Sequence, residues 1–427
     1  MPIDFNANKG IDFGFKPSNP SIIKVIGVGG GGGNAVNHMF NEGIHDVTYV
    51  LCNTDNKALT DSPVPHRLQL GKDGLGAGNN PERAKAAALE SINEIKEMLN
   101  DGTRMVFITA GMGGGTGTGA APIIAQCAKD AGILTVGIVT IPFKFEGQKK
   151  ILQALDGVEE ISKHVDSLLV INNERLRELY PELSLLNAFN KADDTLSIAA
   201  KSIAEIITMH GKINLDFQDV TTVLKDGGVA IMSTGYGEGE NRVTKAIQMA
   251  LDSPLLNKND ITNSERILLN LNFSEEEDNG LTMEEMNELH EFMGRFRNDL
   301  EMKWGVAIDN TLGPKVKITV LATGFGLRNV PDMPKEKWGP EPETDEQKEL
   351  LIEDYYGSNN NESFTQRRPN VYIFKDEDLD NNDTIAMVEN TPTYERSKED
   401  LKKIQGKVQT AEANSEEAAP ESNHVSF

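Results

Sequence analysis

Residues 111–119 read GMGGGTGTG and directly follow the apolar run 105–108. Glycine loses more backbone entropy on folding than any other residue, so six glycines in nine positions would weaken a helix or a strand. One explanation is a flexible linker. The chain continues, however, into IIAQCAKDAG, whose apolar side chains recur at helical spacing. A strand, a glycine loop and a helix in this order point backbone N–H groups at a phosphate, so the run predicts an anion-binding loop.

Two further glycine-rich segments occur at 27–33 and 71–78. The first contains GxGxxG between an expected strand and an expected helix, and Asp55 ends the next expected strand. A dinucleotide-binding oxidoreductase has this arrangement, with the acid on the ribose hydroxyls, and it is one alternative. A Walker A loop is excluded because the chain has no GxxxxGK[ST]. Three glycine loops exceed what a dinucleotide fold uses, whereas a chain of phosphates surrounded by backbone donors explains all three.

The order of the apolar segments predicts the fold class. Strand-like runs alternate with helical segments through the first half, which indicates a parallel sheet covered by helices on both faces. Strands are expected at 22–26, 46–52, 105–109, 133–140, 167–171, 229–233, 267–271 and 315–322, and helices at about 82–99, 193–210, 241–252 and 282–299. We therefore expect an α/β protein in which a parallel-sheet nucleotide-binding domain, Rossmann-related, is joined by a long central helix to a smaller α/β domain.

The expected domain boundaries follow from this order and from composition. A flexible N-terminal arm (1–20) precedes the nucleotide-binding domain (21–192), the central helix (193–213) and the second domain (214–329). Residues 331–427 carry 23 acidic and 11 basic side chains, half of the net charge of −24. Since Pro, Asn and charged residues follow one another there without an apolar period, we expect a disordered acidic linker at 330–383 and a separate tail region at 384–427.

Composition excludes several classes of function. The acidic net charge disfavours nonspecific binding to nucleic acid or to an anionic membrane. No signal peptide opens the chain, and no apolar run approaches the roughly 20 residues of a membrane span, so the cytoplasm is the expected location. Cys52 and Cys127 lie in apolar contexts that suit small buried side chains better than a disulfide. The seven histidines show no metal-ligand spacing.

Residues 113–119, GGGTGTG, match the tubulin signature GGGTG[ST]G in full, and with its other motifs the chain resembles the FtsZ family, bacterial tubulin relatives that build the division ring. The resemblance covers Ile22 to about Arg328. Its further motifs are Asn53-Thr54-Asp55, GLGAGNNP at 74–81, PFKFEG at 142–147, Asn173 before Arg175-Leu176, AFNKADDTL at 188–196, NLDFQD at 214–219 and VKITVLATGF at 316–325. It implies a GTPase that is activated by self-assembly, polymerises head-to-tail and hydrolyses GTP at the subunit interface. A tubulin-like filament for plasmid segregation or cell shape is the alternative.

The resemblance also implies a set of nucleotide-binding residues. The phosphates would lie on the glycine loops, where a side chain would block close approach of the backbone, and Thr116 would add a hydroxyl donor. Glu146 would bind the ribose, Phe189 would stack on the base, and Lys150 stands where the family usually has arginine, which alone makes a planar two-pronged contact. With Ala77, Gly78 and Asn79 over the γ-phosphate and Mg²⁺ held mainly by the phosphates, the full set is Gly30, Gly31, Gly32, Gly33, Asn34, Ala77, Gly78, Asn79, Gly115, Thr116, Gly117, Glu146, Lys150, Asn173, Phe189 and Asp193.

At Asp193 the choice of base can be argued from chemistry. Guanine presents its N1–H and its N2 amino group side by side, and one carboxylate accepts from both, whereas adenine would oppose that carboxylate with a lone pair. The family uses Asn or Asp at this position for that contact. A helix N-cap or first-turn acid is the alternative, because Asp193 begins the expected long helix. The resemblance and this chemistry together predict GTP as the nucleotide.

Asn214, Asp216 and Asp219 place three short polar side chains after the long helix. From the residues alone, a turn or helix cap and a Ca²⁺-like cluster are alternatives, although the further alternating ligands and the distal Glu of a Ca²⁺ loop are missing. In the family this segment reaches the nucleotide of the next subunit. The resemblance therefore implies that Asp216 and Asp219 position and polarise the attacking water and that Asn214 has an orienting role.

The resemblance implies two kinds of partner, further copies of the chain in a head-to-tail homopolymer and membrane-anchored division adaptors at the mid-cell site beneath the inner membrane. Residues 390–396, NTPTYER, resemble the family's adaptor-binding peptide, and NVYIF at 370–374 is a rival. The chain shows no amphipathic membrane helix of its own, so we expect a tether and no direct membrane insertion. Nucleic acid is not expected as a partner.

Overall fold

The computed structural model describes residues 21–43, 46–209, 211–251, 264–276, 279–294, 300–325 and 385–388. Residues 1–358 form one compact unit and 359–427 a second, of which only the short helical segment 385–388 is described. The expected arm (1–20), the linker (330–383) and both candidate peptides (370–374 and 390–396) lie outside the described residues.

The N-terminal half of the first unit contributes six parallel strands, β1 Ile23–Val28, β2 Val47–Asn53, β3 His66–Gln69, β4 Met105–Gly111, β5 Leu134–Ile141 and β6 Ser167–Asn172. They lie in the order β3-β2-β1-β4-β5-β6, and each runs parallel to its neighbours. β1 and β5 are buried along their whole length, as expected for strands covered on both faces. Because β1 and β4 are neighbours, the glycine segments that follow them start side by side at the carboxyl edge of the sheet.

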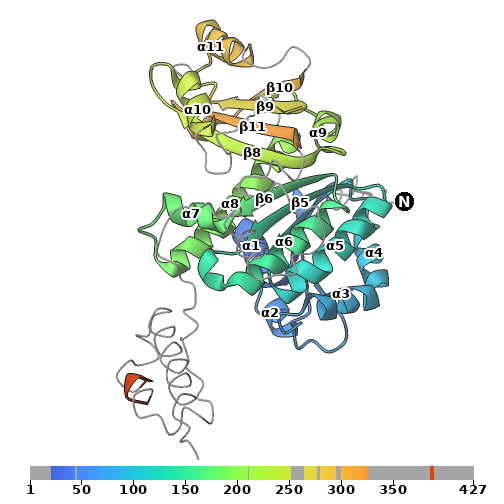
Figure 1. The fold of residues 1–427 in the computed structure, drawn as a ribbon. Helices are drawn as coiled ribbons and strands as arrows, with labels where there is room; N and C mark the ends of the chain where they lie inside the picture. The colour runs from blue at the N-terminus through green and yellow to red at the C-terminus, as the bar shows by residue number, and fades with distance from the viewer. Residues whose placement is uncertain are drawn as a thin grey trace, which may run out of the picture. The chain divides into compact units, whose positions relative to one another are not determined.

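Helices cover both faces of these strands (Figure 1). They are α1 Gly29–Asn41, α2 Asn56–Thr60, α3 Pro81–Glu90, α4 Ile92–Leu99, α5 Gly115–Asp130, α6 Gln148–Ser162, α7 Asn173–Leu179 and α8 Leu185–Thr208, with a 3₁₀ turn η1 at Lys144–Glu146. One face carries α3 to α6, which share a core that includes Ile95, Ile124 and Leu155. The other face carries α1, α2 and α8, whose core includes Val36 and Ile203.

The C-terminal half adds five strands, β7 Gly211–Ile213, β8 Gly228–Gly237, β9 Arg266–Phe273, β10 Glu301–Ile308 and β11 Val316–Phe325. β11 pairs antiparallel with β8 and β9, β10 runs parallel to β9, and β7 runs antiparallel to β10. Ser167 pairs with Gly228 and Leu168 with Val229, so that β6 and β8 join the described strands into one sheet.

The helices described beside these strands are α9 Phe217–Leu224, α10 Arg242–Leu251 and α11 Met283–Met293, and a 3₁₀ turn η3 spans Asn310–Leu312. α10 and α11 pack on one face through a third core that includes Ile247 and Phe292. α9 packs on the other face and shares the core of α8 through Val220 and Val223. The fold is therefore the expected pair of α/β domains with a long helix between them.

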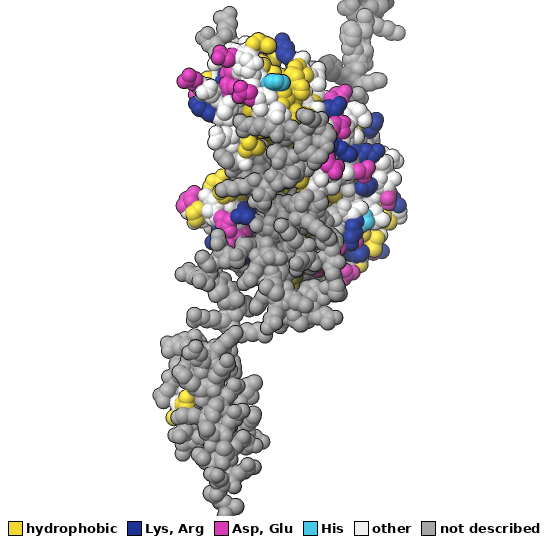
Figure 2. All heavy atoms as spheres, turned by 45° about the horizontal axis from the view of Figure 1, so that its top comes forward, with side chains coloured by type: hydrophobic (Ala, Val, Ile, Leu, Met, Phe, Trp, Pro, Cys, Tyr) yellow, Lys and Arg dark blue, Asp and Glu magenta, His cyan; other side chains and the backbone are white. Residues whose placement is uncertain are grey.

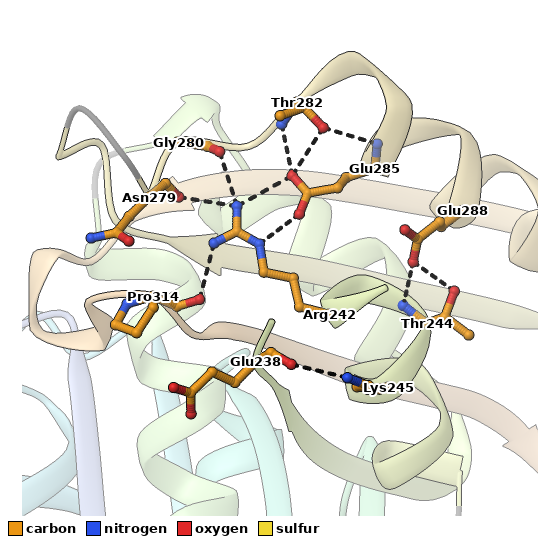
Figure 3. Close-up of polar contacts among 10 residues, drawn as sticks. All are labelled: Glu238, Arg242, Thr244, Lys245, Asn279, Gly280, Thr282, Glu285, Glu288 and Pro314. Atoms are coloured by element: carbon orange, nitrogen blue, oxygen red, sulfur yellow. Dashed lines mark hydrogen bonds and ion pairs between the residues drawn. The ribbon is translucent and has the colours of Figure 1, made fainter. Parts of the chain in front are cut away.

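A buried arginine ties α10 to α11 (Figure 3). Nε of Arg242 donates to Oε1 of Glu285 at 2.6 Å, and Nη2 donates to Oε2 of the same carboxylate at 3.2 Å. The other contacts are to backbone oxygens, those of Asn279, Gly280 and Pro314. One guanidinium thus satisfies a mostly buried carboxylate and three carbonyl groups, which holds the starts of two helices against the loop before β11.

The described surface mixes charges of both signs. On the face drawn in Figure 2, Lys and Arg side chains lie interspersed with Asp and Glu rather than gathered by sign. None of the described helices combines the length and the apolar character needed to cross a membrane.

The central helix and the helix at 82–99 differ from the expectation. α8 begins at Leu185, not at Asp193, and it ends at Thr208. The hydroxyl of Ser184 caps it by accepting from the N–H of Asn187, and the exposed Leu185 and Leu186 hide its amphipathic pattern. The segment 82–99 forms two helices, α3 and α4, that meet at Ser91. Several elements were not predicted, namely α2, α6, α7, α9, β3, β7 and β10.

Candidate nucleotide site

Three glycine segments meet at the carboxyl edge of β1 and β4. A Cβ atom added to Gly29, at the start of α1, would lie 2.9 Å from the backbone N of Gly117, in the first turn of α5. A Cβ added to Gly115 would lie 2.8 Å from the Cβ of Ala77 and 2.9 Å from the N of Asn80, in the third segment. Only glycine permits such close approach, so the sequence-predicted loops at 27–33, 71–78 and 111–119 converge on one place.

The same three segments leave one side open. A Cβ on Gly30, Gly33 or Gly78 would meet no heavy atom within 4 Å, whereas one on Gly32 would overlap the backbone of Thr109. The segments therefore pack tightly against the sheet at Gly32 and leave room for a side chain at Gly30, Gly33 and Gly78, and we call this arrangement the glycine cradle. Gly31 and Asn34 lie exposed in the first turns of α1.

Among the described residues, no side chain caps the N-termini of the two helices that start in this cradle. Neither α1 nor α5 has a side-chain cap, and neither carries an acidic residue in its first turn. The N–H groups of a helix's first turn lack partners within the helix, and they favour a negative charge. Two uncapped N-termini beside an open glycine surface fit an anionic phosphate chain.

Side chains hold the loop at 113–117 in place. The hydroxyl of Thr118 accepts from the N–H of Gly113 at 2.9 Å, and Nε2 of Gln153, on α6, donates to the carbonyl oxygens of Gly113 and Gly114 at 3.1 and 3.0 Å. The hydroxyl oxygens of Thr54 and Thr116 lie 2.7 Å apart. Thr54 lies in a motif already noted, but nothing in the sequence indicated Gln153, because its contact joins residues far apart in the chain.

The turn at 76–79 lies directly before α3. Gly76, Gly78 and Asn79 all have a positive φ, and Asn80 caps α3 by accepting from the N–H groups of Glu82 and Arg83. Ala77 is buried, while Gly78 and Asn79 are exposed. The exposed part of this turn is thus available to a ligand, and its conformation is held by the helix that follows.

Asp55, the acid of the dinucleotide alternative, is the N-cap of α2. Its Oδ1 accepts hydrogen bonds from the N–H groups of Lys57 and Ala58 at 2.9 and 3.4 Å, so it caps α2. In a dinucleotide fold, the carboxylate at the corresponding position faces the ligand and binds the ribose hydroxyls.

A second group of the predicted residues gathers around η1. Oε1 of Glu146 accepts from the N–H of Phe143 at 2.9 Å, and Oε2 pairs with Nζ of Lys150 at 2.5 Å. The rings of Phe143 and Phe189 meet edge to face with their centroids 5.2 Å apart. Lys150 links this group to the cradle, because a Cβ on Gly113 would lie 2.6 Å from its carbonyl oxygen.

Asn173, the first residue of α7, is buried, and its Oδ1 has no hydrogen-bond partner among the described residues. A buried polar atom without a partner costs free energy, which a ligand that donates a hydrogen bond would recover. Phe189, by contrast, is 38% exposed, so one part of its ring remains available for stacking. A nucleotide would supply a hydrogen-bond donor for Oδ1 of Asn173 and a base that stacks on the ring of Phe189.

Asp193 lies well inside α8, and Ser184 occupies the N-cap, so the cap alternative for Asp193 is wrong. Burial raises the pKa of Asp193 to about 6, the nearby His38 acts to lower it, and Asp194 acts to raise it. His38, on α1, pairs with Asp194 across a distance of 2.8 Å between Nε2 and Oδ1. This contact joins the turn of α8 that carries Asp193 to the helix that starts in the cradle.

The segment 214–219 forms the helix cap that the sequence left as an alternative. Asp216 is the N-cap of α9: its Oδ1 accepts from the N–H of Asp219 at 2.9 Å, and Oδ2 of Asp219 accepts from the N–H of Asp216 at 3.2 Å. Oδ1 of Asn214 accepts from the N–H of Gly211 at 2.6 Å. Asn214 and Asp216 are nevertheless exposed, so capping does not remove them from a ligand.

The structure does not bring this segment to the cradle. Asp193 lies near the middle of α8 and the segment follows its C-terminal end, and the fifteen residue steps from 193 to 208 span about 22 Å at the rise of an α-helix. Among the described residues, no three His, Cys, Asp or Glu side chains form a metal-binding group.

Comparisons with known proteins agree with this architecture. The family model described as Tubulin/FtsZ family, GTPase domain, matches residues 22–181; FtsZ family, C-terminal domain, matches 228–326; and FtsZ, C-terminal, matches 366–411. The chain is 49% identical over 405 residues to the cell division protein FtsZ of Porphyromonas gingivalis, which covers 91% of this chain and 88% of the relative. It is 46% identical over 313 residues to the protein of that name in Azotobacter vinelandii, covering 72% and 78%.

Solved structures of the same kind are similar. An FtsZ dimer from M. jannaschii matches with a TM-score of 0.65 and 40% identity, over 71% of this chain and 88% of that one. A CetZ2 protofilament from Haloferax volcanii matches with a TM-score of 0.60 over 72% of this chain and 94% of that one. Its identity is 18%, so it supports the fold alone.

Proposed function

Since this chain belongs to the FtsZ family of cell division proteins and carries its GTPase domain, we propose that it polymerises head-to-tail into division-ring filaments and hydrolyses GTP between subunits. The observation that carries the proposal is the separation of the two parts of the site along α8. The glycine segments and Asp193 precede the second half of α8 and Asp216 follows it, and in this proposal two copies of the chain together complete a site. The solved FtsZ relative is a dimer, which supports this arrangement.

In this proposal the backbone N–H groups of the glycine segments bind the phosphates, with Gly78 and Asn79 over the γ-phosphate. Asp193 accepts from N1–H and the N2 amino group of guanine, and Phe189 stacks on the base. Glu146 binds the ribose through an oxygen that also pairs with Lys150. Mg²⁺, held mainly by the phosphates, offsets their charge when bound.

The neighbouring subunit supplies the groups that act on water. Asp216 is exposed at the N-terminus of α9, where its carboxylate is able to accept a proton or a hydrogen bond from the attacking water. Asp219 and Asn214 hold the loop around it through hydrogen bonds to Asp216 and Gly211. Phosphoryl transfer depends mainly on positioning and on charge, so a fixed carboxylate at this place is sufficient.

The tail is proposed to bind membrane-anchored adaptors and so to hold the filaments at mid-cell beneath the inner membrane. The family model for the FtsZ C-terminus matches 366–411, which contains both candidate peptides, 370–374 and 390–396. The names of the curated relatives favour cell division over plasmid segregation or cell shape.

The shared site is tested by measuring GTP turnover per molecule against protein concentration. Turnover should rise as the protein assembles, because the monomer lacks half of the site. Asp216→Ala should bind GTP as the wild type does, lose at least about 100-fold in turnover, and form filaments that persist because their nucleotide stays intact. Asp309→Ala is the matched control, since Asp309 also caps an exposed turn, by accepting from the N–H of Thr311.

A wild type whose specific activity stays constant from far below to far above the assembly concentration would contradict the shared site. Equal loss of turnover in Asp216→Ala and Asp309→Ala would assign the effect to capping.

A further inference from the structure

Strand β10 packs against the segment 214–219. Ile213 of β7 pairs with Val306, and a Cβ added to Gly305 would lie 2.6 Å from Cγ of Leu215 and 3.0 Å from the carbonyl oxygen of Ile213. Side chains alternate between the two faces of a strand, so Lys303 is on the same face as Gly305. Met302 and Trp304 pack against the core of the opposite face.

Lys303 of β10 contacts the segment 214–219 through Asp219. Its Nζ lies 3.1 Å from Oδ1 of Asp219, and the two side chains are 37% and 26% exposed. The other oxygen of Asp219, Oδ2, accepts from the N–H of Asp216. Both oxygens of Asp219 are therefore used inside the subunit, one on the strand and one on the cap.

Charge supports the same contact. Burial acts to raise the pKa of Asp219, but the N–H of Asp216 and the ammonium group of Lys303 outweigh it and hold that pKa below its usual value. A second charged side chain of the described residues, that of Arg266 on β9, donates to the carbonyl oxygens of Thr222 and Lys225 at the opposite end of α9. Lys303 is thus the cation that faces Asp219.

We propose that Lys303 is a positioning residue for GTP hydrolysis, which holds Asp219, and through it the first turn of α9, so that Asp216 meets the neighbouring subunit's nucleotide in a fixed orientation. Without this ammonium group, Asp219 would keep its capping bond but lose the contact that ties it to β10. The cap would then move with the loop, and Asp216 would be less well placed. This inference rests on the proposed function, because it assumes that Asp216 acts on GTP.

The test compares three variants with the wild type. Lys303→Met keeps the length and the apolar stem and removes the charge, Lys303→Arg restores the charge, and Arg266→Met releases the other end of α9. For each, we would measure the melting temperature, the Kd for GTP, and kcat per sedimented subunit at saturating GTP. Counting only sedimented subunits separates turnover from assembly.

Lys303→Met should lower kcat about fivefold, the upper range for a partly exposed ion pair, with no change in the Kd for GTP. Lys303→Arg should stay within about twofold of the wild type. Arg266→Met should lower the melting temperature without the same loss of kcat, because it leaves the contact between Asp219 and β10 intact.

The inference is overturned if Lys303→Met keeps the wild-type kcat, if Lys303→Arg loses as much as Lys303→Met, or if Arg266→Met reproduces the loss. Should Lys303→Met fail to assemble, Lys303→Gln, which keeps a hydrogen-bond donor but not the charge, takes its place under the same criteria. Failure of the proposed function is distinct, because the wild type would then show turnover independent of its own concentration.

Discussion

At the scale of single residues, the glycines of the first loop are of two kinds. Gly32 is a glycine because the backbone of Thr109 fills the space where a Cβ would lie, whereas the space beside Gly30 is open. The first kind serves packing between α1 and β4, and the second leaves room for a ligand. The two roles are separable by substitution.

Gly30→Ala should leave the protein folded and lower its affinity for GTP. The added methyl group meets no protein atom and improves helix propensity by about 0.5–1 kcal/mol, but it would occupy space next to the phosphates. Gly32→Ala should instead lower the free energy of unfolding by about 1–3 kcal/mol, because its Cβ would overlap the carbonyl oxygen of Thr109. Thermal unfolding and GTP titration measure the two effects. Wild-type affinity in Gly30→Ala would place the phosphates elsewhere.

Asp193 should make GTP binding depend on pH near 6. Its pKa of about 6 applies to the protein without nucleotide, and guanine needs the ionised carboxylate. Affinity should therefore fall as the pH drops through about 6, approaching tenfold per pH unit below it, and binding near pH 6 should release a fraction of a proton. Calorimetry in two buffers of different ionisation enthalpy measures that proton.

Asp193→Asn is the control for this titration, because an amide keeps a hydrogen-bonding group at the position but does not ionise. The affinity of Asp193→Asn for GTP should not show the fall near pH 6 that the ionisation of Asp193 produces in the wild type. If the wild type and Asp193→Asn share one pH profile between 5 and 7, the carboxylate does not contact guanine.

At the scale of elements, the way in which a helix begins indicates its role. α1 and α5 start without a side-chain cap and leave their N–H groups for a ligand. α9 starts with a complete capping box formed by Asp216 and Asp219. The cap interpretation of 214–219 is thus correct as geometry, and it gives a physical reason why a catalytic loop would be rigid: the residue proposed to contact water is held by the helix it begins.

Arg242→Lys should destabilise the second domain by about 2–4 kcal/mol, because a lysine has no planar fork for Glu285 and leaves buried carbonyl groups without donors (Figure 3). Denaturant unfolding measures the loss, and the Kd for GTP should not change, since the cradle lies in the first domain. Lys245→Ala is the control, because the exposed contact of Lys245 with the carbonyl oxygen of Glu238 should contribute less than about 1 kcal/mol. A loss below about 1 kcal/mol in Arg242→Lys would show that the guanidinium contacts of Arg242 are not needed for the stability of the second domain.

At the scale of the whole molecule, the position of the last described strand shows what a C-terminal truncation would leave in place. β11, the last described strand, lies between β8 and β9 and ends at Phe325. Its central place means that both of its edges are paired within residues 228–325.

Removal of residues 331–427 should leave GTP turnover and filament formation largely intact and abolish recruitment to the membrane. The cut removes no strand or helix of the described sheet, but it removes both candidate peptides. Sedimentation and GTP turnover of the truncated chain, with fluorescence imaging in dividing cells, measure the three properties. Unfolding or loss of turnover in the truncated chain would mean that the second domain extends beyond residue 330.

The sequence by itself determined the local pieces of this protein. The strand, glycine segment and helix at 105–130 depend on neighbouring residues, namely apolar side chains, glycines that form a tight turn, and helical spacing. For the same reason the sequence misplaced the start of α8, where exposed Leu185 and Leu186 break the amphipathic pattern. β10 was missed because it is exposed at one end and buried at the other, without a clear alternation.

Only the tertiary structure decided which pieces meet. Thr54 reaches Thr116, Gln153 holds the carbonyl group of Gly113, and Lys303 pairs with Asp219. Each of these contacts depends on the order of strands in the sheet and on the face that each helix covers. Spacing along the chain does not encode that order, because it results from how all the apolar faces are buried together.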